Sequence, residues 1–77
     1  MAKYKGIEIV THRGMDCEAT AEAPPGKVFK DVGCHEVVCG LIGGDRETLK
    51  RCVEHVRRDI DGGFEDCADA ECEWCNS

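Results

Sequence analysis

The residues best suited to chemistry lie in the last fourteen positions of the chain, residues 64–77. This segment holds three cysteines with the spacing C-x4-C-x2-C, which are Cys67, Cys72 and Cys75. It also holds the single tryptophan and five carboxylates, and it has no Lys or Arg. Thiols at this density are typical of a metal site, a disulfide set or a redox device. Each of these would give the protein a different function.

Periodicity separates the other four cysteines into two groups. Cys17, Cys39 and Cys52 fall at apolar positions of predicted strands and a predicted helix. A free cysteine at such a position packs as a small hydrophobe, so we expect these three in the core. Cys34 falls in a break between two predicted strands, beside Gly33. Among the cysteines before residue 64, Cys34 is therefore the one that we expect in a loop.

The lengths of two predicted elements bring Cys34 near the C-terminal thiols. A strand over residues 36–42 spans about 23 Å, and a helix over residues 45–60 spans about 24 Å. If the helix runs antiparallel to the strand, it ends beside Cys34 and His35, where the C-terminal segment begins. We therefore predict a metal site with four ligands: Cys34, Cys67, Cys72 and Cys75, with His35 as the alternative to Cys34.

Zinc is the metal that this ligand set favours. Zn²⁺ takes four thiolates, or three thiolates and an imidazole, in a tetrahedron, and a C-x2-C spacing lets both sulfurs face one ion. The carboxylates nearby oppose this interpretation, because negative charge raises the pKa of a thiol and disfavours the thiolate. Two alternatives therefore stay open: a loosely packed tail with free thiols, and a disulfide or redox role.

The elements that must position these residues follow from hydrophobic periodicity. Residues 4–11 are rich in β-branched side chains, and residues 15–23 alternate between apolar and polar positions. Together they predict a β-hairpin with one dry face. A short third strand is predicted over residues 27–32. The continuous apolar run within residues 36–42 predicts a strand that is covered on both faces.

One amphipathic helix is predicted over residues 45–60. Asp45 suits the N-cap, and Gly62 and Gly63 follow the last turn. The apolar positions form a single stripe, made of Leu49, Cys52, Val53, Val56 and Ile60. We therefore predict an α+β domain over residues 1–63, with an acidic Cys-rich tail over residues 64–77. Its small antiparallel sheet has three to four strands, and the helix packs on one face.

Composition limits the cellular setting and the partners. The 77 residues contain no apolar run of the roughly 20 residues that a transmembrane helix needs, and no secretory segment at the start. We therefore expect a cytoplasmic location, where thiols stay reduced, and the odd count of seven cysteines agrees with this. The net charge of −6 disfavours non-specific binding to nucleic acid.

Catalysis has little support in the sequence. Cys34 and His35 are adjacent, so on an extended chain their side chains point to opposite faces and do not form a nucleophile–base pair. The chain has no phosphate loop, GxSxG, HExxH or dinucleotide motif. The sequence favours a non-enzymatic role over an enzyme.

The charges of the predicted helix are nearly balanced. Its five basic residues stand against four acidic ones. This favours a solvated face with ion pairs, such as Glu47–Arg51 and Glu54–Arg58, over a surface that binds nucleic acid.

Several features of the body match one known family when they are taken in order. They are the opening hairpin, the turn Ala23-Pro24-Pro25-Gly26, the break Gly33-Cys34-His35 and the helix start from Asp45 to Leu49. In this order residues 4–60 resemble the HicB-like antitoxin domain, a small β-β-β-α unit. Members of that family bind and neutralise a partner toxin, often with a separate DNA-binding segment that has no counterpart here. The acidic Cys-rich tail also departs from the family. The resemblance implies a small α+β fold that binds a protein partner.

Three functions follow from these observations. The first is a small cytoplasmic domain that binds a protein partner as a regulatory or adaptor module, with zinc fixing the tail to the body. The second is a thiol redox or metal-handling protein that uses Cys72 and Cys75. The third is binding of nucleic acid through the arginine face of the helix. An open edge strand also leaves room for a homodimer, through edge pairing or helix packing.

Overall fold

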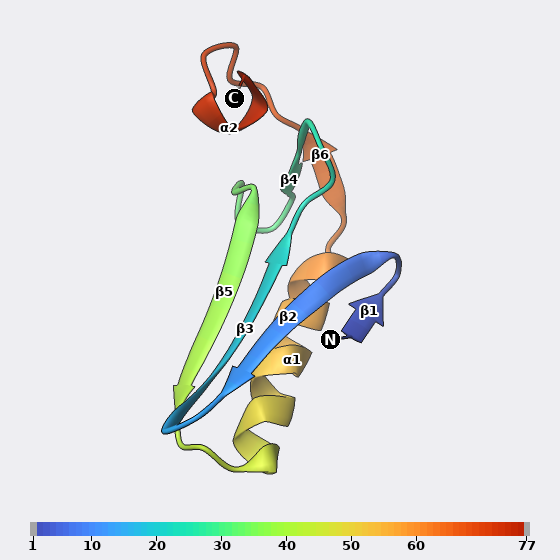
Figure 1. The fold of residues 1–77 in the computed structure, drawn as a ribbon. Helices are drawn as coiled ribbons and strands as arrows, with labels where there is room; N and C mark the ends of the chain where they lie inside the picture. The colour runs from blue at the N-terminus through green and yellow to red at the C-terminus, as the bar shows by residue number, and fades with distance from the viewer. Residues whose placement is uncertain (1, 77) are drawn as a thin grey trace.

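The computed structural model of the chain, which describes residues 2–76, has an α+β fold (Figure 1). The elements in chain order are β1 (Ala2–Tyr4), β2 (Ile7–Arg13), β3 (Asp16–Glu22), β4 (Lys27–Phe29), β5 (Glu36–Ile42), α1 (Arg46–Asp61), β6 (Phe64–Asp66) and α2 (Glu73–Asn76). Four strands form an antiparallel sheet in the order β1-β2-β3-β5, and α1 packs on one of its faces. The predicted fold class is confirmed. Within the described residues, no helix is long and apolar enough to cross a membrane.

The first predicted strand is in fact two strands. β1 and β2 are joined by a tight turn at Lys5 and Gly6, which have φ angles of 51° and 81°. Positive φ at both central residues of a turn is the geometry of a two-residue hairpin, and glycine adopts it without strain. The next hairpin, β2–β3, agrees with the prediction, and Arg13 pairs with Cys17 beside its turn.

Small side chains on β3 let α1 lie close to the sheet. Cys17, Ala19 and Ala21 face the helix and are buried, while the residues between them face away. From the helix, Val56 and Ile60 fill the same layer. The core is therefore one layer between the sheet and the apolar stripe of α1.

The prediction that β5 is covered on both faces is wrong. Val37 faces α1 and is buried, whereas Val38 and Ile42 on the opposite face are 58% and 94% exposed. In the described part of the chain α1 is the only long helix, and it covers one face of the sheet. We call the uncovered side the outer face. The apolar run of β5 therefore supplies residues to a surface as well as to the core.

Both ends of α1 are formed by the residues that the sequence indicates. The carboxylate of Asp45 accepts a hydrogen bond from the backbone N–H of Thr48 at 2.9 Å, as an N-cap does. At the other end, the N–H of Gly62 donates to the carbonyl of Arg58, and that of Gly63 donates to Ile60. Gly63 has a φ of 86°, which turns the chain back towards β4.

The first residues of the predicted tail are integrated into the fold. β6 pairs with β4 in a separate two-stranded sheet, with Phe29 opposite Phe64. The two rings lie 5.0 Å apart between centroids, and Phe29 is fully buried. This small sheet stands at the end of the molecule farthest from the β2–β3 turn, next to α2 (Figure 1). It carries the chain to the C-terminal cysteines.

Candidate metal centre

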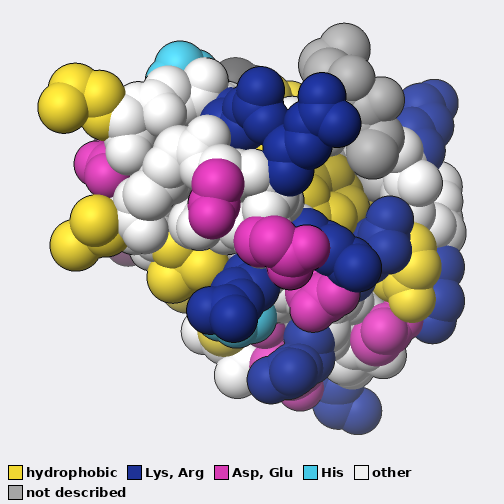
Figure 2. All heavy atoms as spheres, turned by 90° about the horizontal axis from the view of Figure 1, so that it is seen from below, with side chains coloured by type: hydrophobic (Ala, Val, Ile, Leu, Met, Phe, Trp, Pro, Cys, Tyr) yellow, Lys and Arg dark blue, Asp and Glu magenta, His cyan; other side chains and the backbone are white. Residues whose placement is uncertain are grey.

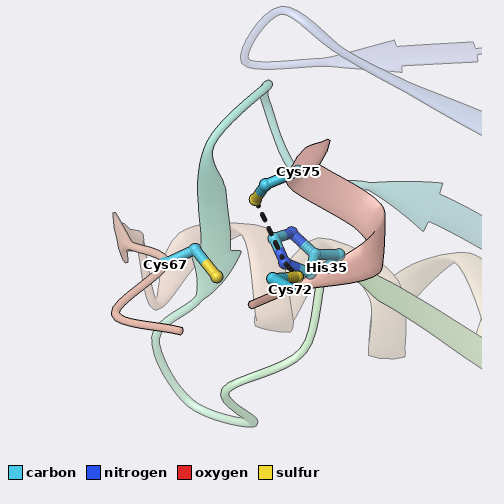
Figure 3. Close-up of side chains that lie close together, drawn as sticks. All are labelled: His35, Cys67, Cys72 and Cys75. Atoms are coloured by element: carbon cyan, nitrogen blue, oxygen red, sulfur yellow. Dashed lines mark hydrogen bonds between the residues drawn. The ribbon is translucent and has the colours of Figure 1, made fainter. Parts of the chain in front are cut away.

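Four side chains with metal-binding atoms converge at this end of the molecule (Figure 3). They are His35, Cys67, Cys72 and Cys75, and their ligand atoms all lie within 4.8 Å of one another. The histidine comes from the loop before β5, and the cysteines come from the segment after β6. We call this set the His/Cys3 group. Three thiols and one imidazole at this spacing could hold a metal ion.

The backbone around His35 decides which residue of the Cys34-His35 pair joins the group. The carbonyl of Cys34 accepts a hydrogen bond from the N–H of Phe29, and that of His35 accepts one from Ala23, both at 2.8 Å. Neighbouring side chains on an extended chain point to opposite sides, so only one of the two can face the C-terminal thiols. His35 does so. Cys34 is exposed, and its sulfur lies 3.5 Å from the carbonyl oxygen of Val32, outside the group.

The structure therefore brings together three of the four cysteines predicted as ligands, with the alternative ligand His35 in the fourth position. The choice between Cys34 and His35 depends on which of them forms the isolated β-bridge with Phe29. Cys34 forms it. That bridge joins Phe29 of β4 to a residue of the following loop, and the spacing of the cysteines gives no sign of it.

The three cysteines are placed by backbone hydrogen bonds. The N–H of Cys67 donates to the carbonyl of Gly26 at 2.9 Å, which extends the pairing of β4 with β6 by one step. The chain then turns at Asp69, whose side chain accepts from the N–H of Glu71 at 3.0 Å and whose carbonyl accepts from the N–H of Cys72 at 3.3 Å. This turn returns the chain towards His35.

The imidazole contacts two of the three sulfurs directly. Nε2 of His35 lies 3.2 Å from Sγ of Cys72 and 3.7 Å from Sγ of Cys75 (Figure 3). Its ring is stacked on Trp74, with 5.5 Å between centroids and 4° between the planes. The other ring nitrogen, Nδ1, is buried and has no hydrogen-bond partner within residues 2–76. The nitrogen that faces the thiols is therefore Nε2.

The thiols of the group differ in acidity. Hydrogen bonds from the backbone of Cys75, from the His35 side chain and from the backbone of Trp74 lower the pKa of Cys72 to about 7, against the opposing effect of burial. Burial and the neighbouring thiols of Cys67 and Cys72 raise the pKa of Cys75 to about 11. One thiolate thus forms readily, and the next is opposed by its neighbours. A divalent cation between the sulfurs would remove this opposition.

The carboxylates of the segment do not crowd the sulfurs. All five are exposed, and they are Glu65, Asp66, Asp69, Glu71 and Glu73. Asp66 is ion-paired with Lys27, and Asp69 caps the turn before Cys72. The main causes of the pKa shifts at Cys72 and Cys75 include no carboxylate. The electrostatic objection to a metal site is therefore weaker than the sequence suggests.

The three cysteines expected in the core do not share one environment. Cys17 and Cys52 are buried, as predicted, whereas Cys39 is only half-buried. The sulfur of Cys39 lies 3.2 Å from Nδ1 of His55, an exposed residue of α1. Cys39 reaches the surface because β5 is the edge strand of the sheet. We did not predict this contact, since the position of β5 in the sheet is not readable from the sequence.

The basic residues of α1 border a hollow at the other end of the molecule. The hollow has a volume of about 580 Å³, and its lining includes Leu49 and Val53 with Arg13, Arg46 and Lys50. Figure 2, which views this end, shows basic side chains around a recessed apolar patch, with carboxylates among them. The two expected helix ion pairs do not form, and the ion pairs of the described residues are Lys5–Asp61 and Lys27–Asp66.

Comparison of the chain with models of known protein families, with curated proteins and with solved structures finds no match. The resemblance to the HicB-like antitoxin domain therefore stays a prediction.

Proposed function

We propose that this protein is a small zinc-stabilised domain that binds a protein partner. The observation that carries the zinc part is the convergence of His35 with three thiols within 4.8 Å. Three thiolates and one imidazole form a closed structural zinc set, because four protein ligands leave no position open for a substrate. Tetrahedral zinc needs about 3.8 Å between two sulfurs and about 3.6 Å between sulfur and nitrogen. Nε2 of His35 lies 3.2 Å from Sγ of Cys72 and 3.7 Å from Sγ of Cys75, close to the sulfur–nitrogen distance that zinc needs.

Zinc would supply stability that the C-terminal segment lacks. Residues 68–75 contain no buried side chain, and α2 has only four residues, which is too short for a helix to be stable alone. A domain of this size gains little from its core, and a structural metal is a common supplement. The binding free energy of such a metal is folding free energy.

The outer face of the sheet supports the partner-binding part. A row of Val10, Thr20 and Val38 crosses three strands in register, and Val10 and Val38 are 50% and 58% exposed. Exposed carboxylates surround the row, namely Glu8, Asp16, Glu18, Glu22 and Glu36. Lys3 is the single Lys or Arg at an outer-face position of the described sheet. This surface suits a partner segment with apolar side chains flanked by Lys and Arg.

Native mass spectrometry with and without a chelator tests the zinc part. We expect one zinc per chain, and a lower melting temperature after chelation. Metal-free protein that melts at the same temperature as the purified sample would rule out structural zinc.

Heteronuclear NMR with a synthetic peptide of Leu and Lys tests the partner part. We expect shift changes along the outer face, and we expect Val38→Asp to abolish them. Shifts confined to α1, or none at all, would contradict the proposed surface.

The thiol chemistry of the group favours one alternative, a redox or metal-handling protein. The pKa of Cys72 is lowered to about 7, first by the backbone of Cys75, and the Cys72 side chain is half-buried, so part of it is open to solvent. A thiol with these properties reacts readily when no metal protects it. Thiol titration of the purified protein separates the two functions. Slow, metal-protected thiols favour structural zinc, and fast reaction at Cys72 favours redox chemistry.

A cytoplasmic setting belongs to the same proposal. All seven cysteines are free, and thiols stay reduced in the cytosol.

A further inference from the structure

The second thiol cluster of the molecule lies between β5 and α1, apart from the metal centre. Its members are Cys39 on β5, and Cys52 and His55 on α1. Sγ of Cys39 is 3.2 Å from Nδ1 of His55. Burial and a side-chain hydrogen bond with Cys39 raise the pKa of the Cys52 thiol. The Cys39 side chain therefore contacts an imidazole and packs against the core cluster that contains the second thiol, Cys52.

The three side chains differ in exposure. The thiol that would be oxidised first is the more exposed of the two cysteines, and the imidazole beside it is open to solvent. His55 is exposed, Cys39 is half-buried, and Cys52 is fully buried. A small oxidant can therefore reach Cys39 from solvent, whereas Cys52 has no exposed surface. The imidazole can take the proton of the Cys39 thiol and give it to the leaving group of the reaction.

We propose that Cys39 is a peroxide-sensitive thiol, that His55 serves as its base, and that Cys52 is the thiol that resolves the oxidised form. In the first step the Cys39 thiolate attacks one oxygen of hydrogen peroxide. The O–O bond breaks, Cys39 becomes the sulfenic acid, and the departing hydroxide takes the proton from His55 and leaves as water. In the second step the thiol of Cys52 attacks the sulfur of that sulfenic acid, a disulfide forms, and a second water leaves. Two thiols are oxidised by two electrons while one peroxide is reduced.

The product would join the edge strand to the helix. β5 and α1 pack against each other through this layer, so a Cys39–Cys52 disulfide would tie α1 to the rim of the sheet. The reaction uses none of the His/Cys3 ligands, and it therefore goes beyond the proposed zinc site.

Peroxide treatment of the 77-residue, zinc-loaded protein tests this inference. After alkylation of the remaining thiols, tryptic cleavage at Arg46, Lys50 and Arg51 leaves Cys39 and Cys52 on separate peptides. We expect a linked pair of these peptides that lacks two hydrogen atoms. Cys39→Ala should abolish the pair. In Cys52→Ala, dimedone should trap the sulfenic acid at Cys39.

The base is tested by the rate of the reaction. We expect His55→Gln to slow oxidation of Cys39 by about tenfold, which is below the usual effect of a general base because the imidazole is exposed. His12→Gln, an exposed histidine of β2, is the matched control and should react at the wild-type rate. Zinc content, measured in parallel, separates this chemistry from oxidation of the metal centre.

Two results would overturn the proposal. One is a Cys39 that stays unmodified at peroxide concentrations that oxidise Cys34, the exposed cysteine outside both clusters. The other is a wild-type rate for His55→Gln. Because Cys52→Ala alters a fully buried position, the Cys39 and His55 variants decide the outcome if that protein does not fold.

Discussion

At the scale of single residues, the metal centre depends on which side of the backbone each of two neighbours faces. Cys34 bridges to Phe29 and turns its thiol to solvent, so His35 faces the three C-terminal thiols. Because one step along an extended chain reverses the direction of the side chain, the fourth ligand is an imidazole at one of these two positions and a thiolate at the other. A pair of single substitutions therefore distinguishes the two possible ligand sets.

We expect His35→Ala to weaken zinc binding and Cys34→Ala to leave it unchanged. Loss of an outer-shell partner already costs about 10–100-fold in metal affinity, and loss of a ligand should cost more. His35→Cys supplies a fourth thiolate and should retain much of the affinity. Competition with a chromogenic chelator measures all three proteins. A Cys34→Ala protein that loses zinc while His35→Ala keeps it would make Cys34 the ligand.

The spacing of the cysteines made part of this site predictable. The rest depends on backbone pairing, which the sequence pattern does not reveal. The C-x2-C spacing identifies Cys72 and Cys75, and the length match of β5 and α1 brings the tail to the Cys34-His35 loop. The choice of His35 follows from the bridge between Phe29 and Cys34 across a short turn, and the apolar and cysteine spacing carries no signal for that bridge. The half-exposed position of Cys39 has the same origin, because it depends on β5 being at the edge of the sheet.

At the scale of elements, α1 depends on the hydrogen bonds at its first turn. The side chain of Thr48 and its backbone N–H both donate to the Asp45 carboxylate, and they hold the pKa of that carboxyl below its usual value. A carboxyl whose pKa is lowered by folding stabilises the fold above its unfolded pKa. That stabilisation is lost as the pH falls through the folded pKa.

We therefore expect Asp45→Ala to lower the melting temperature by a few degrees at neutral pH, and to have little effect in acid below the folded pKa. Asp45→Asn keeps a capping oxygen but cannot titrate, so it should retain most of the stability with a flatter pH dependence. Thermal unfolding followed by circular dichroism between neutral and acid pH checks this. An Asp45→Ala effect of equal size at both extremes would mean that the carboxylate charge is irrelevant.

The strand pair β4–β6 links the main core to the metal centre through Phe29. This ring is fully buried and packs on Phe64, and the same pair of strands places Cys67. Truncating a buried phenylalanine to alanine costs about 3–5 kcal/mol, a large part of the stability of a small domain.

We expect Phe29→Ala to lower the free energy of unfolding by about 3–5 kcal/mol. We also expect it to weaken zinc binding, although residue 29 is not a ligand. Phe29→Leu should lose less of both. Val38→Ala, on the exposed outer face, should change neither, and it serves as the control. Denaturant unfolding and zinc competition on the same samples check the coupling. Normal zinc affinity in a destabilised Phe29→Ala protein would show that the two are independent.

At the scale of the whole molecule, the two faces of the sheet differ in what covers them. One face packs on α1 and holds the core, and the other presents the apolar row of Val10, Thr20 and Val38 among carboxylates. The metal centre lies at one end, beyond the end of β3, so zinc can hold the C-terminal segment without covering the outer face. Stability and binding should therefore respond to different substitutions.

Reversing the charge of Glu18 and Glu36 to Lys tests this division. Both carboxylates are exposed at outer-face positions, so we expect the double variant to melt close to the wild type and to keep its zinc. Its affinity for the Leu/Lys peptide should fall, because the attraction between the acidic face and the cationic side chains becomes repulsion. Wild-type affinity should also fall as salt rises past about 0.1 M, where the Debye length shortens to about 10 Å. If the double variant binds the peptide as tightly as the wild type, the apolar row alone directs binding and the carboxylates do not select a basic partner.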